Sequence, residues 1–402
     1  MTWPLTWPMT WNARIAGFAA LAALGPLPGV ALPAAAFETR GAAALVVDHA
    51  TGLTLYAKNA EEPRPPASMS KLMTLYMLFE ALRDGRVTPE TEFTVSQKAQ
   101  AMGGSRMFLE AGERVPVSAL IDGIIVQSGN DACVVVAENL YGSESAFAAA
   151  MTKRAHELGM DETTLKNASG WPEPGHVMSS HDLVTLARRI LEDFPEQYAH
   201  FAKTEFTWNG ITQQNRNPLL TAGVGADGLK TGHTNEAGYG LTGSAVRDGQ
   251  RIVFVVSGLA SMSERAAETT ELVNWAFGAF EPIRFFDKGA TVAEAAVWLG
   301  AAPVVPLVAP ADITMLAPRG LRDQITARVV YDGPVPAPIA AGQALGRLVV
   351  EAPGQDPTSY ALVAGADVAE GGLGVRLSAA GRLALDRARG IFDGSGQDTT
   401  QE

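Results

Sequence analysis

The sequence predicts an α+β protein in which helices surround an antiparallel sheet, followed by a small all-β domain. Three observations support this fold class. Strand-like runs occur near residue 45 and return after residue 205. The residues between them place apolar side chains at helical spacing, and residues 283–375 are rich in Val, Ala, Pro and Gly with short strand-like runs. The 402 residues are enough for two or three domains.

Composition narrows the possible functions. Hydrophobic residues make up 47% and charged residues 18% of the chain, which is typical of a folded globular protein. The net charge of −12 argues against a nucleic-acid partner, which would favour a basic surface. The single cysteine, Cys133, excludes an internal disulfide and a multi-cysteine metal site, and the six histidines form no H-E-x-x-H pair. We therefore expect neither a metal nor a cofactor.

Residues 1–36 are predicted to be a secretory signal peptide. Arg14 is the only charge before Glu38, and the apolar run 15–24 is too short to span a bilayer stably. Residues 34–36 are alanines that fit a cleavage site, which would make Phe37 the first mature residue. An uncleaved N-terminal anchor is the alternative. In either case we expect the protein to be secreted across the inner membrane into the periplasm.

The first structured element is expected to be a β-hairpin, residues 42–48 and 53–57, with a turn at Thr51-Gly52. A helix then begins at Ser68, after Pro65-Pro66 and before Gly85. Its apolar face is Leu72, Leu75, Tyr76, Phe79 and Leu82. Lys71 is unusual because the helix dipole disfavours a cation in the first turn. Either Ser68 is an N-cap and Lys71 a solvated charge, or Ser68 is a nucleophile and Lys71 its base.

Further helices are expected over residues 117–127, 132–140, 144–160 and 181–192, the last capped by Ser179 or Ser180. The first two are separated by Ser128-Gly129-Asn130-Asp131. A polar loop, Ser96 to Gly112, precedes them and is a candidate for a mobile wall over a site.

Strands are expected again from Phe206 onward, with a turn at Asn209-Gly210. Asp227-Gly228 leads into Lys230-Thr231-Gly232, and two strands, 239–245 and 251–258, precede a helix at 263–280. The all-β domain is expected to contain strands near residues 296–299, 325–331, 344–350 and 360–363.

Residues 376–392 form a basic amphipathic pattern that would either lie on an anionic membrane surface or pack on its own domain. Residues 394–402 are expected to be disordered. The domain organisation predicted from these patterns is a signal peptide 1–36, a first domain 37–281, a β-rich domain 282–375, and a helix with a tail, 376–402.

Three short motifs point jointly to one chemistry: Ser68-x-x-Lys71, Ser128-Gly129-Asn130 and Lys230-Thr231-Gly232. Each is weak alone, but their order and local context are specific. With Asn215-Arg-Asn and Asp227-Gly-Leu-Lys-Thr-Gly-His-Thr, the chain resembles the low-molecular-mass penicillin-binding proteins of the D-alanyl-D-alanine carboxypeptidase family. The resemblance covers residues 37–281 and, more loosely, the rest. It implies a penicillin-binding-protein/β-lactamase-like domain and a C-terminal helix that anchors to the membrane.

The resemblance also implies the reaction and the residues that perform it. The substrate would be a peptidoglycan stem peptide, and penicillins would acylate Ser68. The implied catalytic residues are Ser68, Lys71 and Ser128; the implied binding residues are Asn130, Lys230, Thr231, Gly232, His233 and Arg265. Lys230 would lower the pKa of Lys71 as a second nearby ammonium. Ser169 stands where some relatives have histidine, so a role of that histidine in deacylation does not transfer.

Two other functions fit the same motifs. A DD-endopeptidase or a β-lactamase on this scaffold would use the same serine and lysine, although the Ser-Gly-Asn motif and the extra β domain argue against a class A lactamase. A non-catalytic wall-binding protein would keep the cleft without turnover. Retention of Ser68, Lys71, Ser128, Asn130 and Lys230 argues against this last interpretation.

Overall fold

The structure is a computed structural model that describes residues 3–4, 37–353 and 356–378. The chain divides into two compact units, Pro33–Phe280 and Glu281–Glu402, the latter together with the N-terminal segment. The expected signal peptide lies outside the described residues except for the two-residue strand β1 (Trp3–Pro4). Residues 373–378 are helical, and the remainder of the expected C-terminal helix and the tail lie outside the described residues.

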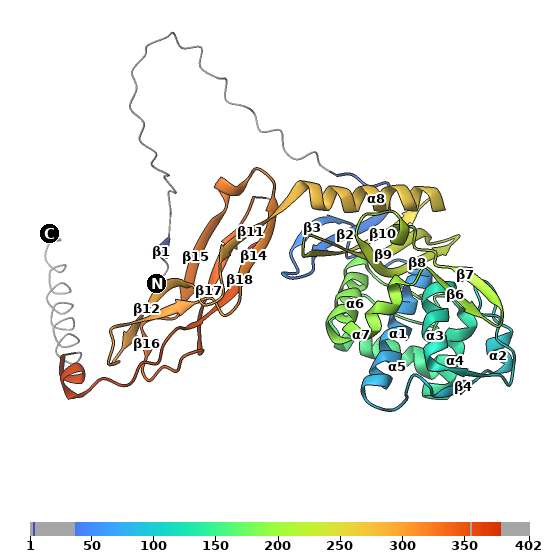
Figure 1. Cartoon of the computed structure of the whole chain (residues 1–402), viewed down its shortest axis with the longest axis horizontal. Helices are drawn as coiled ribbons and strands as arrows, with labels where there is room; N and C mark the ends of the chain where they lie inside the picture. The colour runs from blue at the N-terminus through green and yellow to red at the C-terminus, as the bar shows by residue number, and fades with distance from the viewer. Residues whose placement is uncertain (1–2, 5–36, 354–355, 379–402) are drawn as a thin grey trace, which may run out of the picture. The chain divides into compact units, whose positions relative to one another are not determined.

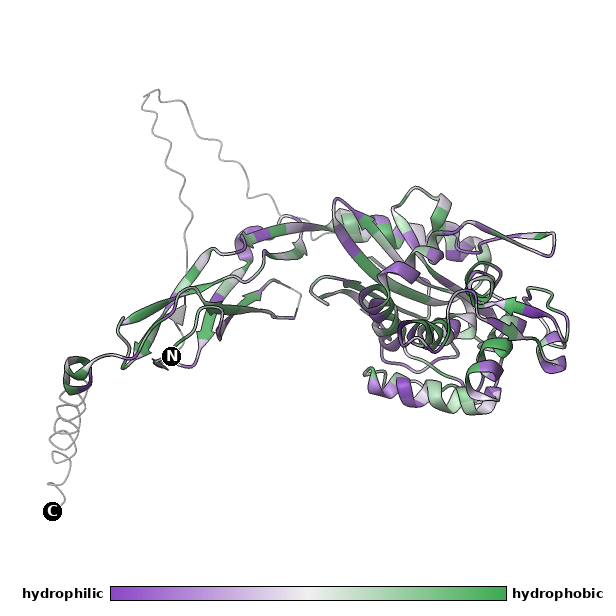
Figure 2. Ribbon diagram, turned by 60° about the horizontal axis from the view of Figure 1, so that its bottom comes forward, coloured by the Kyte–Doolittle hydropathy of each residue, from purple (hydrophilic) through white to green (hydrophobic). Residues whose placement is uncertain are grey.

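The unit Pro33–Phe280 is built on a five-stranded antiparallel sheet with the order β3-β2-β10-β9-β8 (Figure 1). Its strands are β2 (Ala43–Asp48), β3 (Thr54–Lys58), β8 (Ala226–Thr234), β9 (Gly238–Arg247) and β10 (Gln250–Leu259). Hydrophobic residues appear green in Figure 2 on strands and helices alike, and every residue of β2 is buried. β8, which carries the Lys-Thr-Gly motif, is an edge strand. The predicted hairpin and the two predicted late strands are confirmed.

Helices cover both faces of this sheet. α8 (Met262–Ala279) packs on β9 and β10, and α6 (Ser180–Asp193) packs on β2 and β10 from the opposite side (Figure 1). The other helices are α1 (Lys71–Arg83), α2 (Gln97–Gln100), α3 (Val117–Asp122), α4 (Asn130–Tyr141), α5 (Glu144–Glu157) and α7 (Pro195–Tyr198). Two small hairpins complete the unit: β4 (Glu92–Thr94) with β5 (Arg114–Pro116), and β6 (Glu205–Trp208) with β7 (Ile211–Gln214). Ser179 caps α6 by accepting a hydrogen bond from the Asp182 N–H, as predicted.

α1 is buried on almost all sides, whereas its sequence predicted a single apolar face. It contacts α4, α5 and α6, so even Lys71 and Thr74 are removed from solvent. The Tyr76 ring packs at 5.0 Å and the Phe79 ring at 5.6 Å from the Phe194 ring. Full burial of each such side chain stabilises the fold by about 1.5–3 kcal/mol. The beginning of α1 is therefore a rigid place on which to fix chemical groups.

The loop Ser96–Gly112 is tied to α4 by several hydrogen bonds. Asp131 accepts hydrogen bonds from the backbone N–H groups of Met107, at 2.9 Å, and Leu109, at 3.2 Å. The Asn130 N–H donates to the Ser105 carbonyl at 2.8 Å. The predicted wall beside Ser128 is thus anchored directly to the helix that follows the Ser-Gly-Asn motif.

The second unit is all-β, as predicted. Its larger sheet has the order β1-β15-β17-β18-β13-β12-β16, and β11 pairs with β14 separately. The strands are β11 (Phe280–Phe286), β12 (Thr291–Trp298), β13 (Val304–Val308), β14 (Ile313–Pro318), β15 (Thr326–Tyr331), β16 (Val335–Pro336), β17 (Ala344–Glu351) and β18 (Thr358–Ala364). The sequence predicted four of these strands, β12, β15, β17 and β18. It missed β11, β13, β14 and β16, each of which contains a proline. Within the described part of the chain, no helix has the length and apolar character needed to span a membrane.

Candidate active site

Ser68 lies in a short 3-10 turn, η1 (Ala67–Ser70), that runs directly into α1. Ala67 before it has a φ of 49°, a left-handed conformation that is costly for a residue with a Cβ. No side chain caps η1 or α1, so the interpretation of Ser68 as an N-cap is wrong. The Ser68 side chain is instead directed to Lys71.

Lys71 is completely buried and makes three hydrogen bonds through its Nζ. It donates to Ser68 Oγ at 2.8 Å and to Asn130 Oδ1 at 2.7 Å. The third acceptor is the Ser169 carbonyl oxygen, at 2.5 Å. These contacts join the first two sequence motifs around one nitrogen atom, and they include an acceptor that neither motif contains.

Burial lowers the pKa of Lys71 to about 8, with Arg216 acting in the same direction. Asp131 and Cys133 oppose this shift. The sequence predicted Lys230 as the second cation that lowers this pKa. The structure shows that these two lysines repel each other, since the charge of Lys71 lowers the pKa of Lys230, and it adds Arg216 as a cation that the sequence did not predict. A lysine with this pKa has a substantial neutral fraction near neutral pH and can accept a proton.

Ser128 occupies the break between α3 and α4, following a π-helical segment, η2 (Gly123–Gln127). Its φ of 60° and ψ of 37° are left-handed. Its Oγ is buried and has no hydrogen-bond partner among the described residues. Two residues later, Asn130 donates through Nδ2 to the Gly103 carbonyl at 2.8 Å while its Oδ1 accepts from Lys71. The Ser128 hydroxyl, which no described residue engages in a hydrogen bond, is free to contact a ligand.

The third motif lies on β8, beside η1. A Cβ on Gly232 would lie 2.8 Å from the Pro66 carbonyl oxygen, so only glycine lets the strand approach the turn this closely. Lys230 is buried and donates to the Thr231 carbonyl at 3.1 Å. Burial, followed by the charges of Lys71, Arg216 and Arg265, lowers its pKa well below the usual value. Thr231 is also buried.

Arg265 and His233 both contact the Tyr239 ring. The His233 ring, on an exposed residue, stacks on the Tyr239 ring with centroids 3.8 Å apart. The Arg265 guanidinium lies 5.7 Å from the Tyr239 centroid and is buried. It donates to the Arg216 carbonyl oxygen at 3.2 Å. Arg265 therefore belongs to the buried site, and its interpretation as a surface arginine is wrong.

The sequence missed one wall of the site, the segment Asn167–Trp171. Asn167 Oδ1 accepts hydrogen bonds from the N–H groups of the three residues at positions 169–171, at 2.8–3.2 Å. Gly170 has a φ of 75°, and a Cβ there would lie 1.9 Å from the Ala67 carbonyl oxygen. The signal for this wall was present in the Asn-Ala-Ser-Gly stretch, which is typical of a side-chain-stabilised turn. The contact of this segment with Ala67, far away in the sequence, could not be predicted from that stretch.

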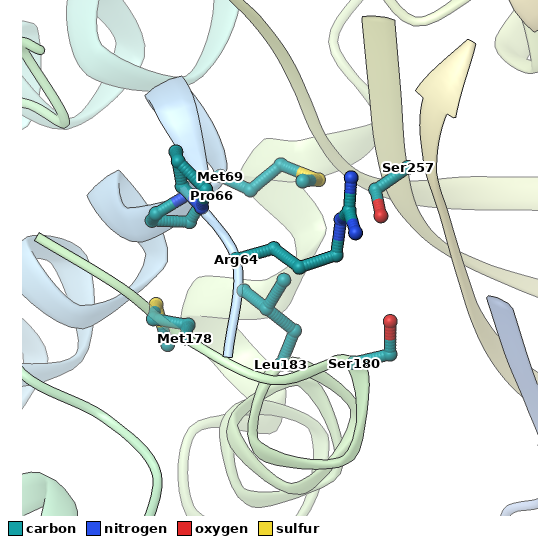
Figure 3. Close-up of a pocket in the computed structure, with 8 residues that line it drawn as sticks. Arg64, Pro66, Met69, Met178, Ser180, Leu183 and Ser257 are labelled. Atoms are coloured by element: carbon teal, nitrogen blue, oxygen red, sulfur yellow. The ribbon is translucent and has the colours of Figure 1, made fainter. Parts of the chain in front are cut away.

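A hollow with an interior of about 10 Å³ lies next to η1, and Figure 3 shows the Arg64 side chain extending across it toward Ser257. Met69 and Leu183 are among its lining residues. The lining includes none of Lys71, Ser128 and Lys230, so this hollow is separate from the cluster described above. Among the described residues, no three His, Cys, Asp or Glu side chains come together in a way that could hold a metal ion.

Residues 31–261 match the D-alanyl-D-alanine carboxypeptidase family. The chain belongs to that family. Residues 280–370 match a second family, the C-terminal domain of penicillin-binding protein 5. The family resemblance and the fold class predicted from the sequence are confirmed, and so is the class of enzyme, a serine peptidase.

Individual relatives cover nearly the whole chain. The D-alanyl-D-alanine carboxypeptidase DacD of Escherichia coli is 36% identical, and the match covers 83% of this chain and 88% of the relative. The carboxypeptidase DacF of Bacillus subtilis is also 36% identical, over 78% and 82% of the two chains. The crystal structure of penicillin binding protein 5 from Haemophilus influenzae has a TM-score of 0.76 at 32% identity, over 83% of this chain and 99% of that one.

Proposed function

We propose that this protein is a serine-type D-Ala-D-Ala carboxypeptidase that removes the terminal D-alanine from peptidoglycan stem pentapeptides. The contact between Lys71 Nζ and Ser68 Oγ, at 2.8 Å, carries the proposal because a buried amine of lowered pKa is a base within reach of a hydroxyl. The Ser128 hydroxyl, which is buried and has no hydrogen-bond partner among the described residues, would supply a second group for proton transfer.

Acylation would replace the C–N bond between the last two D-alanines by a C–O bond to Ser68. Ser68 Oγ forms a bond to the carbonyl carbon between the last two D-alanines, and its proton passes to Lys71 Nζ. The C–N bond then breaks, and Ser128 relays a proton from Lys71 to the leaving amine, with Lys230 nearby. The backbone N–H groups of Ser68 and His233 would stabilise the oxyanion. Water then hydrolyses the acyl-enzyme, which restores the Ser68 hydroxyl.

The remaining site residues would bind the peptide. Asn130 would hold a substrate amide, since its Nδ2 donates one N–H to the Gly103 carbonyl and has a second N–H to offer. Lys230, Thr231 and Arg265 would bind the terminal carboxylate, and Gly232 would leave room for substrate backbone along β8. The buried positive charges of Lys230 and Arg265 favour an anionic group at this end of the site.

Penicillins would acylate Ser68 in place of the peptide. The decisive experiment is intact mass after exposure to a fluorescent penicillin, with Ser68→Ala as the matched control. An adduct on the wild type alone supports the proposal, and an adduct on both proteins would contradict it. Release of D-alanine from pentapeptides separates a carboxypeptidase from an endopeptidase, which would act on crosslinked muropeptides. Rapid penicillin turnover would indicate a β-lactamase.

The location of the enzyme is part of the proposal. Residues 1–36 would direct secretion across the inner membrane and be removed, leaving the enzyme in the periplasm. The basic segment 376–392 would attach it peripherally to the inner membrane. Sedimentation with anionic vesicles, compared between the full chain and a chain ending at residue 375, tests the attachment. Equal sedimentation of the two chains would remove the C-terminal helix as an anchor.

A further inference from the structure

A second hollow, open to solvent and with an interior of only about 10 Å³, the room of one water-sized group, adjoins the turn that carries Ser68. One side is formed by residues 65–67, which lead directly to the nucleophile. The second side is formed by residues 170–173 with His176, and the third by Thr234 and Glu236 at the end of β8. None of the cations Lys230, Arg216 and Arg265 lines it. It therefore lies apart from Lys230 and Arg265, the two charges proposed to bind the terminal carboxylate.

Two carboxylates and an aromatic ring give this hollow its character. Glu173 and Glu236 are both exposed. Trp171 is 45% exposed although it is large and apolar. Its ring is held against the loop that binds Asn130, since a Cβ on Gly104 would lie 3.0 Å from the indole. Carboxylates and an accessible indole face both attract an organic cation.

His176 provides an independent sign that a ligand group belongs here. It is only 4% exposed and lines the hollow. Its Nδ1 accepts a hydrogen bond from the Lys166 N–H at 3.1 Å, so the proton of the neutral ring is on Nε2. That buried N–H has no partner among the described residues. Burial, followed by the charges of Lys71 and Lys166, lowers the pKa of His176 to about 4, so the ring is neutral at neutral pH. The two carboxylates must therefore outweigh these two cations at the hollow.

We propose that this hollow binds the side-chain ammonium of the residue that precedes the two terminal D-alanines, with Glu173 and Glu236 as its counter-charges and Trp171 as its aromatic wall. The Nε2–H of His176 would donate to a carbonyl oxygen of the same substrate segment. The proposal rests on the proposed function and adds a specificity for stem peptides with a free diamino-acid side chain. An ammonium needs no convergence of three ligands, unlike a metal ion.

Two peptides that differ only in this charge test the inference with the full-length enzyme. One is Nα-acetyl-L-Lys-D-Ala-D-Ala with a free ε-ammonium, and the other carries an acetyl group on that nitrogen as well. We expect kcat/KM for D-alanine release to favour the free ammonium by roughly three- to tenfold, as a partly exposed ion pair with a cation–π contact would. In the double variant Glu173→Gln/Glu236→Gln, the ratio should fall to about one. Glutamine keeps the acceptor that Glu173 offers to Asn167 Nδ2 at 3.3 Å.

The matched control is Glu90→Gln, which removes one negative charge at an exposed position outside the hollow and should leave the ratio unchanged. Trp171→Leu should lower the ratio of the two kcat/KM values, but by less than the double variant does. A ratio near one for the wild type, or a ratio retained in the double variant, would overturn the inference and leave the proposed function intact. Failure of both peptides to release D-alanine would instead overturn the proposed function together with the inference.

Discussion

The Lys71 side-chain nitrogen lies 2.8 Å from the hydroxyl oxygen of Ser68, although the two residues belong to different kinds of helix. Ser68 is in a 3-10 turn and Lys71 is the first residue of α1. The tight turn places residues three apart almost above one another, which a continuous α-helix does less closely. The nucleophile and its base are therefore aligned by local backbone geometry before any substrate binds.

Replacement of Lys71 by arginine should inactivate the enzyme although the positive charge is kept. A guanidinium stays protonated and cannot accept the Ser68 proton. We expect acylation by a fluorescent penicillin and release of D-alanine to fall by at least about 10²-fold, the usual contribution of a general base. Lys98→Arg is the control, since Lys98 is a half-exposed lysine paired with Glu144. Acylation at the wild-type rate in Lys71→Arg would remove Lys71 as the proton acceptor.

The acylation rate should rise with pH with an apparent pKa of about 8, because only the neutral amine of Lys71 accepts a proton. The Arg216 charge lowers this pKa, so Arg216→Gln should move the rise to higher pH. Arg216→Lys retains the charge and should leave the midpoint closer to that of the wild type. Stopped-flow measurement of penicillin acylation between pH 6 and pH 10 gives the midpoint for each protein. An unchanged midpoint in Arg216→Gln would contradict the electrostatic role of Arg216.

Gly170→Ala should disrupt the site, whereas Gly175→Ala should not. Both glycines have positive φ values, 75° and 80°, so both substitutions carry the cost of a left-handed alanine, about 1–2 kcal/mol. Only at Gly170 would the new Cβ meet backbone, 1.9 Å from the Ala67 oxygen; at Gly175 the nearest atom is 3.5 Å away. We expect Gly170→Ala to lose penicillin acylation as well as stability. Similar acylation rates in the two variants would show that contact with Ala67 is not needed.

The titration of His176 should lower the free energy of unfolding as the pH falls from about 6.5 to about 4. In the unfolded chain its pKa is near 6.5, and burial in the folded chain lowers it to about 4. The unfolded state therefore binds the proton first, at a cost to folding of about 3 kcal/mol at the lower pH. His176→Gln, which keeps an acceptor for the Lys166 N–H, should flatten the dependence of the urea midpoint on pH.

A control of opposite sign is available in the same segment. The carboxylates of Asp182, with Oδ1 3.8 Å from His181 Nδ1, and of Glu61 raise the pKa of His181, so protonation of His181 stabilises the fold at low pH. His181→Gln should therefore make the loss of stability at acid pH steeper. Parallel urea titrations at pH 4 and pH 7 compare the two variants, and equal slopes for both would contradict the assignment of His176.

The elements that sequence predicted best were those whose pattern is local. The strand pattern of β9 and β10, the periodicity of α6 and its Ser179 cap, and the interruption at Ser128-Gly129-Asn130 all follow from neighbouring residues. The π-helical segment η2 escaped prediction because its apolar residues, Ile124 and Ile125, fit an α-helix equally well. The single apolar face expected for α1 underestimated its burial, since that depends on three other helices.

The candidate site likewise combines features that neighbouring residues encode with features that depend on residues far away in the sequence. The motif residues around Lys71 could be named because their types and order are specific, and burial could be expected to lower its pKa, but the contribution of Arg216 could not. The Arg216 charge and the carbonyl of Ser169 reach Lys71 from 145 and 98 residues along the chain, and no local spacing encodes either contact. The same holds for Gly170, whose need to be glycine comes from a backbone atom of Ala67.

The third acceptor of Lys71 is a backbone oxygen, and this has a consequence for comparing enzymes of this type. Any amino acid at position 169 supplies the same carbonyl, provided that Gly170 and the amide turn of Asn167 keep the segment in place. A different residue at position 169 therefore keeps this contact as long as the buried space around Ser169, which is 1% exposed, accommodates its side chain. The glycine that follows has no such freedom, since a Cβ there would meet the Ala67 carbonyl.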